Sequence, residues 1–306
     1  PGMPYAVEPF ELLTTALSAL CWRRENGSIC MVCDSRAAEY YASLGLDFLW
    51  DDGMHPLLDA MPDDINATAF WAAGKLYAVA AMKAPCVMLD TDLICWKNID
   101  TLLDGVDAAA IHREDIVPSI YPDKSAFSRS HGFDFDKFDW TVQPLNTALC
   151  YFGSDEFRRY YTDTAIRFMH SGPQADDTLT YMVFAEQRLL AMCAEKAHIR
   201  IRALSDLPSL FGGAQNGYFS HVWGFKQQMR EDPALYEDFC RRCAALENLC
   251  PHFHLSMQSG CDTVLQRMNR KYDSKRYYES VELLHGVYDR PAITSDLIVG
   301  FPGETE

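Results

Sequence analysis

The stretch Pro85-Cys86-Val87-Met88-Leu89-Asp90-Thr91-Asp92 places four consecutive apolar residues directly before two carboxylates. A short apolar run of this kind is typical of a strand that is buried on both faces. Residues 69–83, which precede it, have helical spacing, and Pro85 ends that helix because proline lacks a backbone donor. Ligands bind beyond the carboxyl ends of strands in open α/β sheets, so we expect Asp90 and Asp92 at a binding edge.

Helical and strand patterns alternate along the chain on both sides of this stretch. Helices are expected over residues 8–24, 36–44, 155–170 and 178–196, and strands over 29–33, 48–50, 106–111 and 147–152. Residues 113–143 are polar and rich in Pro, Ser, Asp and Phe, which is typical of a long surface loop. The alternation predicts an α/β fold, with a mixed, mostly parallel sheet that carries helices on both faces.

Length and composition limit the classes of protein to consider. The chain has 306 residues, and at about 150 residues per domain this predicts two domains. Its hydrophobic content of 48% excludes wholesale disorder, and no apolar run is long enough to span a membrane. A net charge of −16 argues against broad, charge-driven binding of nucleic acid. Both ends look cut, since the chain starts at Pro1-Gly2 and stops at Thr305-Glu306 within a motif.

The cysteines indicate a reducing compartment. There are eleven, an odd number, and several lie in apolar stretches, so we expect free thiols and a cytoplasmic location. Cys30 and Cys33 are spaced as a metal-binding pair, but they fall in an expected strand. Successive strand side chains point to opposite faces, which favours structural thiols over a chelating pair.

The Asp90/Asp92 pair also indicates a metal. Two oxygen ligands one residue apart suit Mn²⁺ or Mg²⁺, while an ordinary acidic loop start is the alternative. Residues 220–226 offer His221 as a third ligand and Lys226 as a cation for a phosphate group. A histidine with a purely structural role is the other interpretation of His221.

Two further polar segments are candidates. Asn146 opens an expected strand, where its amide could bond a sugar hydroxyl or merely cap a turn. Glu186-Gln187 interrupts an apolar helix and marks either a site or the solvent face of that helix.

Taken in this order, these segments resemble the GT-A glycosyltransferases, particularly family-eight-like enzymes and predicted bacterial hexosyltransferases. The resemblance covers residues 5–240 and rests on five segments: Phe70 to Lys75, Pro85 to Lys97, Gln143 to Phe152, Glu186-Gln187, and His221 to Lys226.

This resemblance implies a Rossmann-like GT-A fold and transfer of a hexose from a nucleotide sugar, a UDP-hexose, to an unknown acceptor. It implies a metal ion held by Asp90, Asp92 and His221. It also implies catalytic roles for Glu186 and Gln187, which would lie near the transferred sugar, and donor contacts by Lys75, Asn146 and Lys226. The family's opening strand is missing or truncated before Pro4.

The last part of the chain has a different resemblance. Residues 249–306 resemble the radical S-adenosylmethionine tRNA methylthiotransferases, most of all those acting on threonylcarbamoyladenosine. The resemblance rests on three segments: Leu249 to Asp262, Arg267 to Tyr272, and Thr294 to Thr305.

The second resemblance implies a partial (β/α) barrel with an S-adenosylmethionine pocket lined by Gln258, Ser259, Asp296 and Gly300. The family holds its [4Fe–4S] cluster on a C-x3-C-x2-C loop, a spacing that this sequence lacks. We therefore do not expect S-adenosylmethionine or the cluster to be used here. A strand is expected over 253–256 and another over 296–299.

These features predict a glycosyltransferase domain over 1–240 and an incomplete methylthiotransferase fragment over 241–306. The leading function is metal-dependent glycosyl transfer. One alternative is a radical S-adenosylmethionine tRNA methylthiotransferase, with tRNA as partner; another is a non-catalytic GT-A-like binding module. A junction between unrelated coding sequences near 235–250, from gene rearrangement or faulty read assembly, accounts for both ancestries.

Overall fold

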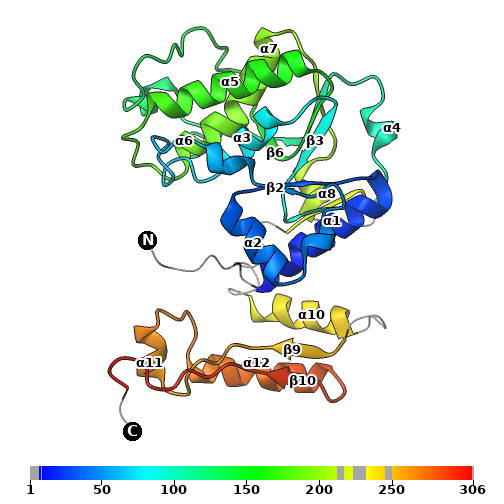
Figure 1. The fold of residues 1–306 in the computed structure, drawn as a ribbon, viewed down its shortest axis with the longest axis vertical. Coiled ribbons are helices and arrows are strands. Elements are labelled where there is room, and N and C mark those ends of the chain that lie inside the picture. The colour runs from blue at the N-terminus through cyan, green and yellow to red at the C-terminus, as the bar shows by residue number, and fades with distance from the viewer. Residues whose placement is uncertain (1–6, 8, 212–216, 223–231, 245–249, 305–306) are drawn as a thin grey trace. The chain divides into compact units, whose positions relative to one another are not determined.

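A computed structural model describes residue 7 and residues 9–211, 217–222, 232–244 and 250–304 (Figure 1). The chain forms two compact units, residues 1–223 and residues 224–306. The expected boundary at 240/241 therefore lies inside the second unit. The reason is that Cys240 packs with Leu284 and Tyr288 in the core of that unit.

The first unit contains short strands and helices that alternate along the chain. Its strands are β1 (Met31–Val32), β2 (Met54–His55), β3 (Cys86–Leu89), β4 (Leu93–Cys95), β5 (Ala108–Arg113), β6 (Leu145–Phe152), β7 (Ile201–Ala203) and β8 (Phe219–His221). Its α-helices are α1 (Pro9–Asn26), α2 (Ser35–Ser43), α3 (Ala73–Ala81), α4 (Asp100–Leu103), α5 (Asp155–Ser171), α6 (Thr180–Val183), α7 (Leu189–Lys196) and α8 (Leu207–Phe211). Three 3₁₀ turns, η1 (Asp47–Leu49), η2 (Leu57–Ala60) and η3 (Lys124–Phe127), and one π-helical turn, η4 (Phe184–Arg188), complete it.

The main sheet has the strand order β3-β6-β5-β7. Strand β6 is antiparallel to both β3 and β5, and only the β5–β7 pair is parallel. The α/β class is confirmed, but the expectation of a mostly parallel sheet is wrong for the described strands. The long connection from β5 to β6 lets β6 return beside β5 in the opposite direction, without the helical crossover that parallel neighbours need.

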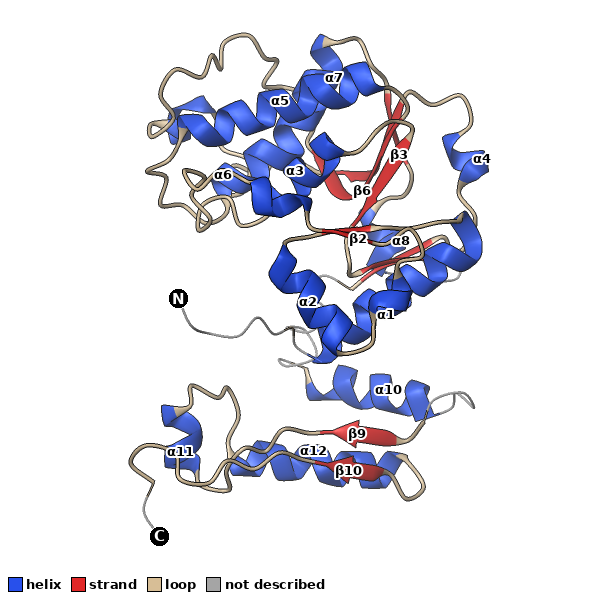
Figure 2. Cartoon of the chain, viewed as in Figure 1, coloured by secondary structure: helices blue, strands red, loops and turns tan. Residues whose placement is uncertain are grey.

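Apolar side chains on both faces of this sheet form cores. On one face, Cys150 and Phe152 of β6 pack with residues of α3, α5 and α7. Ala148 and Leu149 join a second core with residues of α1, β4 and β8. Helices α5 and α7 run side by side in Figure 2. The sheet is thus covered on both sides, as the sequence predicts.

Strand β3 coincides with the expected run of residues 86–89, but it lies at the edge of the sheet and its four residues are only half-buried. Full burial was expected because the run is wholly apolar. The edge position explains the difference, since one side of the strand has no neighbour in the described sheet. The expected strand over 48–50 is the 3₁₀ turn η1.

A surface loop was expected over residues 113–143; the connection between β5 and β6 covers residues 114–144 and folds back onto the core through its aromatic side chains. The Phe127 ring lies 4.5 Å from that of Phe184, and the Phe133 ring lies 5.2 Å from that of Phe168. Phe127 is 3% exposed. Edge-to-face and tilted aromatic pairs stabilise by about 0.5–1.5 kcal/mol beyond burial, so this segment is anchored even though its only regular element is η3.

The second unit contains α10 (Pro233–Ala244), β9 (His252–His254), α11 (Asp262–Arg267), α12 (Ser274–Val287) and β10 (Ala292–Thr294). Strands β9 and β10 are parallel and are joined through α11 and α12 (Figure 2). Asp273 caps α12 by accepting a hydrogen bond from the backbone N–H of Arg276. The second strand was expected over 296–299, but beyond β10 these residues make only a single bridge, between Leu297 and Gln258.

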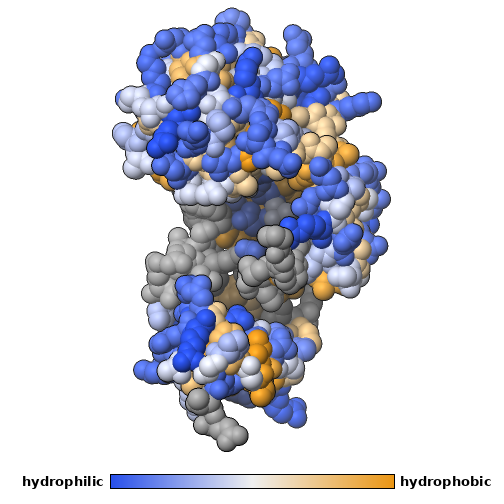
Figure 3. All heavy atoms as spheres, turned by 60° about the vertical axis from the view of Figure 1, so that its left-hand side comes forward, coloured by the Kyte–Doolittle hydropathy of each residue, from blue (hydrophilic) through white to orange (hydrophobic). Residues whose placement is uncertain are grey.

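The exposed faces of both units are largely polar in the view of Figure 3. Among the described residues, no helix combines the length and the apolar character that a membrane crossing requires.

Candidate functional site

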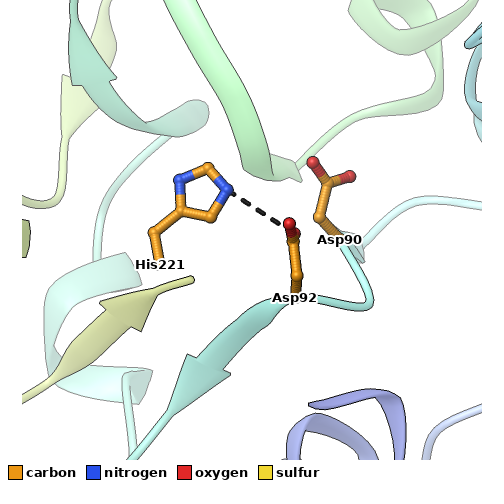
Figure 4. Close-up of side chains that lie close together, drawn as sticks. All are labelled: Asp90, Asp92 and His221. Carbon is orange, nitrogen blue, oxygen red and sulfur yellow. Dashed lines mark ion pairs between the residues drawn. The ribbon is translucent and has the colours of Figure 1, made fainter. Parts of the chain in front are cut away.

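The turn between β3 and β4 positions the two carboxylates of the first unit. The backbone N–H of Asp90 donates to the Ala148 carbonyl over 2.8 Å and so extends the pairing of β3 with β6. The N–H of Leu93 then donates back to the Asp90 carbonyl over 3.1 Å and closes the turn. The Asp90 and Asp92 side chains consequently lie at the end of the sheet, as the sequence predicts (Figure 4).

Strand β8 brings His221 to the same place. It pairs antiparallel with β4, with His221 opposite Leu93. The His221 Nε2 atom lies 3.5 Å from an oxygen of Asp92. One ligand atom from each of Asp90, Asp92 and His221 lies within 4.8 Å of the others, the only such trio of His, Cys, Asp or Glu in the described part of the chain. Two carboxylates and an imidazole are a suitable donor set for a divalent cation.

Lys75 and Glu186 extend this trio into a cluster of charges. The Lys75 ammonium, on α3, lies 2.8 Å from an Asp90 oxygen and also pairs with the Glu186 carboxylate. Burial alone would lower the pKa of Lys75, but the two carboxylates outweigh it and raise that pKa above its ordinary value. Three carboxylates face one ammonium, so the cluster keeps an excess of negative charge.

The two aspartates differ in their titration. Burial raises the pKa of Asp90, and the neighbouring carboxylates of Glu186 and Asp92 add to this, although Lys75 opposes it. Burial would also raise the pKa of Asp92, but the facing His221 reverses the effect and holds it below its ordinary value. Asp92 is therefore the more strongly ionised of the pair.

The π-helical turn η4 places Glu186 inside the unit. The wider turn interrupts the helix between α6 and α7, and the Glu186 side chain is 6% exposed. The Thr147 hydroxyl of β6 donates to the Glu186 carboxylate, and the Tyr161 hydroxyl donates to its backbone carbonyl over 2.7 Å. Single π turns inside α-helices are frequent at functional sites. Glu186 is thus held toward Lys75 and is not on a solvent face.

Two other residues expected around a donor sugar, Asn146 and Gln187, have hydrogen-bond partners outside the trio Asp90, Asp92 and His221. The Asn146 amide donates to Glu114 over 3.2 Å, and Gln187 accepts a hydrogen bond of 2.5 Å from the Tyr121 hydroxyl. Lys226 lies outside the described residues.

Sequence reasoning missed Thr147, Tyr121 and Glu114 as partners of the site. Period-two alternation along β6 could have identified Thr147, which is buried in a strand otherwise made mostly of apolar residues. Tyr121 and Glu114 lie in the long connection, where no periodic pattern indicates contacts.

In the second unit, the residues expected to bind S-adenosylmethionine follow the carboxyl ends of the two parallel strands. Gln258 and Ser259 come after β9 and are 7% and 6% exposed. Gln258 has a φ of 65°, an uncommon conformation for a residue other than glycine. Its carbonyl accepts from the N–H of Ile298 over 2.8 Å, which joins the two segments beyond the strands.

Asp296 and Gly300 follow β10. The Asp296 carboxylate lies 3.3 Å from Nε2 of His254. Gly300 has a φ of 79°, and its N–H donates to the Glu304 carboxylate over 2.7 Å. The four expected residues therefore lie on the same end of the β9–β10 pair, the end where ligands bind in βα folds.

Comparison with protein families gives one match. Residues 229–306 match the family model described as the radical SAM superfamily, where SAM is S-adenosylmethionine. The last part of the chain is therefore similar to radical S-adenosylmethionine proteins, within a mixed α/β structure.

Similar curated proteins include several named tRNA-2-methylthio-N(6)-dimethylallyladenosine synthase. The protein from Oleidesulfovibrio alaskensis is 61% identical over 62 residues, which are 20% of this chain and 13% of the relative. Those from Parafrankia sp. and Mycobacterium bovis are 46% and 44% identical over 70 residues, 23% of this chain and 14% of each relative. The chain thus spans only about a seventh of the length of these relatives.

These matches correct four expectations. The leading function, metal-dependent glycosyl transfer by a GT-A enzyme with a D-x-D motif and manganese, is contradicted, because the family and the relatives are radical S-adenosylmethionine and tRNA-modifying proteins. The nucleotide-sugar partner and the Mn²⁺ or Mg²⁺ cofactor are contradicted for the same reason. So is the expectation that S-adenosylmethionine and a [4Fe–4S] cluster are not used, since both are the cofactors that the superfamily implies.

The relatives' names also specify dimethylallyladenosine, where threonylcarbamoyladenosine was expected. Three of the five segments behind the glycosyltransferase resemblance are only two to six residues long. Such short motifs arise readily at the edge of an α/β sheet.

Proposed function

We propose that residues 224–306 form the S-adenosylmethionine-binding part of a radical S-adenosylmethionine tRNA methylthiotransferase. The observation that carries this proposal is the superfamily match over residues 229–306. The placement of Gln258 and Asp296 beyond the carboxyl ends of β9 and β10 supports it, because that is the ligand-binding end of βα folds.

The residues at this end fit S-adenosylmethionine in chemistry. Gln258 is buried, and within the described residues its side-chain amide makes no hydrogen bond, which leaves it available to a polar ligand. The Ser259 hydroxyl and the Asp296 carboxylate offer further polar contacts for the ribose hydroxyls and the amino group. The backbone around Gly300 can approach a ligand closely because it carries no Cβ. When bound, S-adenosylmethionine supplies a transferable methyl group and a source of radical chemistry.

The [4Fe–4S] cluster does not fit the residues present in the described part of the chain. Such clusters need several thiolates around one centre, and no three cysteines of the described residues lie close enough together. Burial raises the pKa of the Cys240 and Cys243 thiols, which favours the protonated form that does not ligate iron. We derive no chemical step through the cluster.

We propose tRNA as the macromolecular partner, following the names of the relatives. The segment from α11 into α12 supports this with a local concentration of cations, namely Arg267, Arg270, Lys271, Lys275 and Arg276. Since the whole chain carries a charge of −16, binding should depend on this segment and weaken with salt. A tRNA partner and the free cysteines together favour the cytoplasm as the compartment.

Equilibrium dialysis of the full chain with radiolabelled S-adenosylmethionine tests the proposal. We expect saturable binding that weakens at least tenfold in Gln258→Ala, because a buried hydrogen-bonding partner is removed. Gln266→Ala is the matched control, since Gln266 is an exposed glutamine on α11 of the same unit. Absence of saturable binding, or equal weakening in both variants, would contradict the proposal.

For the first unit we propose a cation site at Asp90, Asp92 and His221, with Lys75 and Glu186 as neighbouring charges. For residues 5–240 we propose a GT-A-like fold only, without glycosyltransferase activity. The support is the trio's spacing and the excess of negative charge. In calorimetric titration with Co²⁺, the Asp92→Asn variant should bind one equivalent fewer than the unaltered chain, whereas Asp100→Asn, a variant of an exposed aspartate nearby in sequence, should bind as many as the unaltered chain. An unchanged Co²⁺ stoichiometry in Asp92→Asn would contradict the site.

A further inference from the structure

The face of the β9–β10 pair that points away from the core carries an array of polar side chains. Phe253 and Ile293, which are opposite each other in the two strands, pack into the core of the second unit. Side chains alternate along a strand, so His252 and His254 lie together on the other face. Thr294 is the register partner of His254, and all three residues are exposed.

The two imidazole rings converge on one hydroxyl. His252 Nε2 and His254 Nδ1 each lie 3.1 Å from Thr294 Oγ1. A hydroxyl carries a single proton, so it can donate to only one of two neutral rings and must accept from the other. The Asp296 carboxylate, 3.3 Å from His254 Nε2, favours the tautomer with the proton on that nitrogen. The lone pair of His254 Nδ1 then accepts a hydrogen bond from the Thr294 hydroxyl, and the Thr294 oxygen accepts one from Nε2–H of His252.

We infer that His252 Nε2 and His254 Nδ1 form a binding site for a divalent transition-metal ion, with Thr294 beside it and Asp296 behind His254. Neutral imidazole is a preferred ligand of Zn²⁺, Ni²⁺, Cu²⁺ and Fe²⁺. Histidines that ligate metals usually donate their other N–H to a carboxylate or carbonyl, which fixes the ring orientation. Asp296 occupies that position relative to His254.

The site closes by rotation of exposed side chains. A bound ion needs each nitrogen at about 2.0–2.1 Å, so the rings must turn toward each other and away from their bonds to Thr294. His252 must also take the tautomer with its proton on Nδ1, which frees the lone pair of Nε2 for the ion. His254 is 41% exposed, which leaves its ring free to make this change. Thr294 Oγ1 and water complete the coordination. The site is independent of Asp90, Asp92 and His221, and it does not require S-adenosylmethionine, although Asp296 is shared with the proposed pocket.

Cobalt is the probe, because its visible spectrum reports the ligands. Co²⁺ is titrated into the full chain in the Asp92→Asn background, which removes the proposed site of the first unit. We expect one equivalent with the weak visible bands of nitrogen and oxygen ligation, without the intense near-ultraviolet bands of thiolate ligation. The double variant His252→Ala/His254→Ala should lose it. His285→Ala is the matched control, an exposed histidine of α12, and should keep it.

The Asp296→Asn variant tests the orienting role. Loss of an outer-shell partner typically weakens metal affinity 10–100-fold, and we expect that change at unaltered stoichiometry. A second measurement uses the unaltered chain, so misfolding of a variant cannot affect it. Diethyl pyrocarbonate carbethoxylates accessible histidines, and peptide mass spectrometry maps the modified residues. Co²⁺ should suppress this modification at His252 and His254 but not at His285. The inference is overturned if the double variant keeps the equivalent, if Asp296→Asn binds unchanged, or if Co²⁺ protects neither histidine.

Discussion

Replacing Lys75 with methionine removes the one ammonium that the described residues bring to the cluster with Asp90, Asp92 and Glu186. The Glu186 side chain is 6% exposed and cannot regain its solvation, whereas the side chains of Lys75 and Asp90 are 25% and 26% exposed. Removing one partner of a buried ion pair costs about 3–5 kcal/mol, and the partial exposure places this change near 3 kcal/mol. The methionine side chain keeps most of the lysine volume, so little of the loss comes from a cavity.

Tryptophan fluorescence during urea unfolding measures this loss in the first unit alone, because all six tryptophans lie within residues 1–223. With a slope of about 3 kcal/mol per molar urea, the midpoint should fall by about 1 M. Loss of Lys75 raises the pKa of Asp90 further, so the destabilisation is complete above that raised pKa. The destabilisation by Lys75→Met should become smaller as the pH is lowered toward about 4, because Asp90 of the folded chain is then protonated, and at that pH the unfolded chain also protonates this residue.

Two variants decide whether charge is the cause. Lys83→Met alters an exposed lysine close in sequence and should change stability by less than about 0.5 kcal/mol. Lys75→Met/Glu186→Gln removes both members of a pair and should recover at least half of the loss. The argument is refuted if Lys75→Met behaves like Lys83→Met, or if the two substitutions of the double variant are simply additive.

Three further outcomes are expected. Leu284→Ala, at a position 2% exposed in the core of the second unit, should cost about 2–5 kcal/mol, seen as faster amide hydrogen exchange in β9 and β10. The hydrogen bond from the N–H of Ala84 holds the pKa of Asp155 at about 2. The stabilisation that the ionised Asp155 contributes is therefore complete above about pH 4 and is lost as the pH falls through 2. In Asp155→Asn, the free energy of unfolding, followed by tryptophan fluorescence, should fall less steeply between about pH 4 and pH 2. Arg188→Met removes two hydrogen bonds to carbonyls of the segment 114–144 and should cost about 2–4 kcal/mol in urea unfolding, and a loss below 0.5 kcal/mol would contradict this.

Local patterns predicted elements whose ends are marked by strong signals. The strand over 86–89 was predicted at its observed bounds, because an apolar run lies between a proline and an aspartate. The direction of β6 could not be predicted, since it depends on how the connection 114–144 folds. The misplaced strand over 296–299 has a related cause. The run Leu297-Ile298-Val299 is apolar enough for a strand, but a strand also needs a neighbour to pair with.

The candidate sites were predictable to the extent that they follow strand ends. Asp90 and Asp92 could be predicted because they directly follow an apolar strand. The pairing of β4 with β8 then places His221 beside them. The Lys75–Glu186 pair was not predictable, because a π turn alters the face on which Glu186 lies. Five segments scattered over residues 70–226 led to the wrong function, whereas three segments close together within residues 249–306 led to the superfamily that the comparison supports.

The aromatic anchoring of residues 114–144 determines how the chain should respond to proteases. Enzymes that cut after aromatic residues must reach the ring and the backbone beside it, and here Phe127, Phe133 and Phe138 are each less than 8% exposed. The segment is therefore shielded at these three residues, and cutting there requires prior local unfolding of the core. Limited digestion with chymotrypsin should leave the chain uncut at these residues, and the rate of cutting there should track the stability of the aromatic cluster rather than the length of the loop.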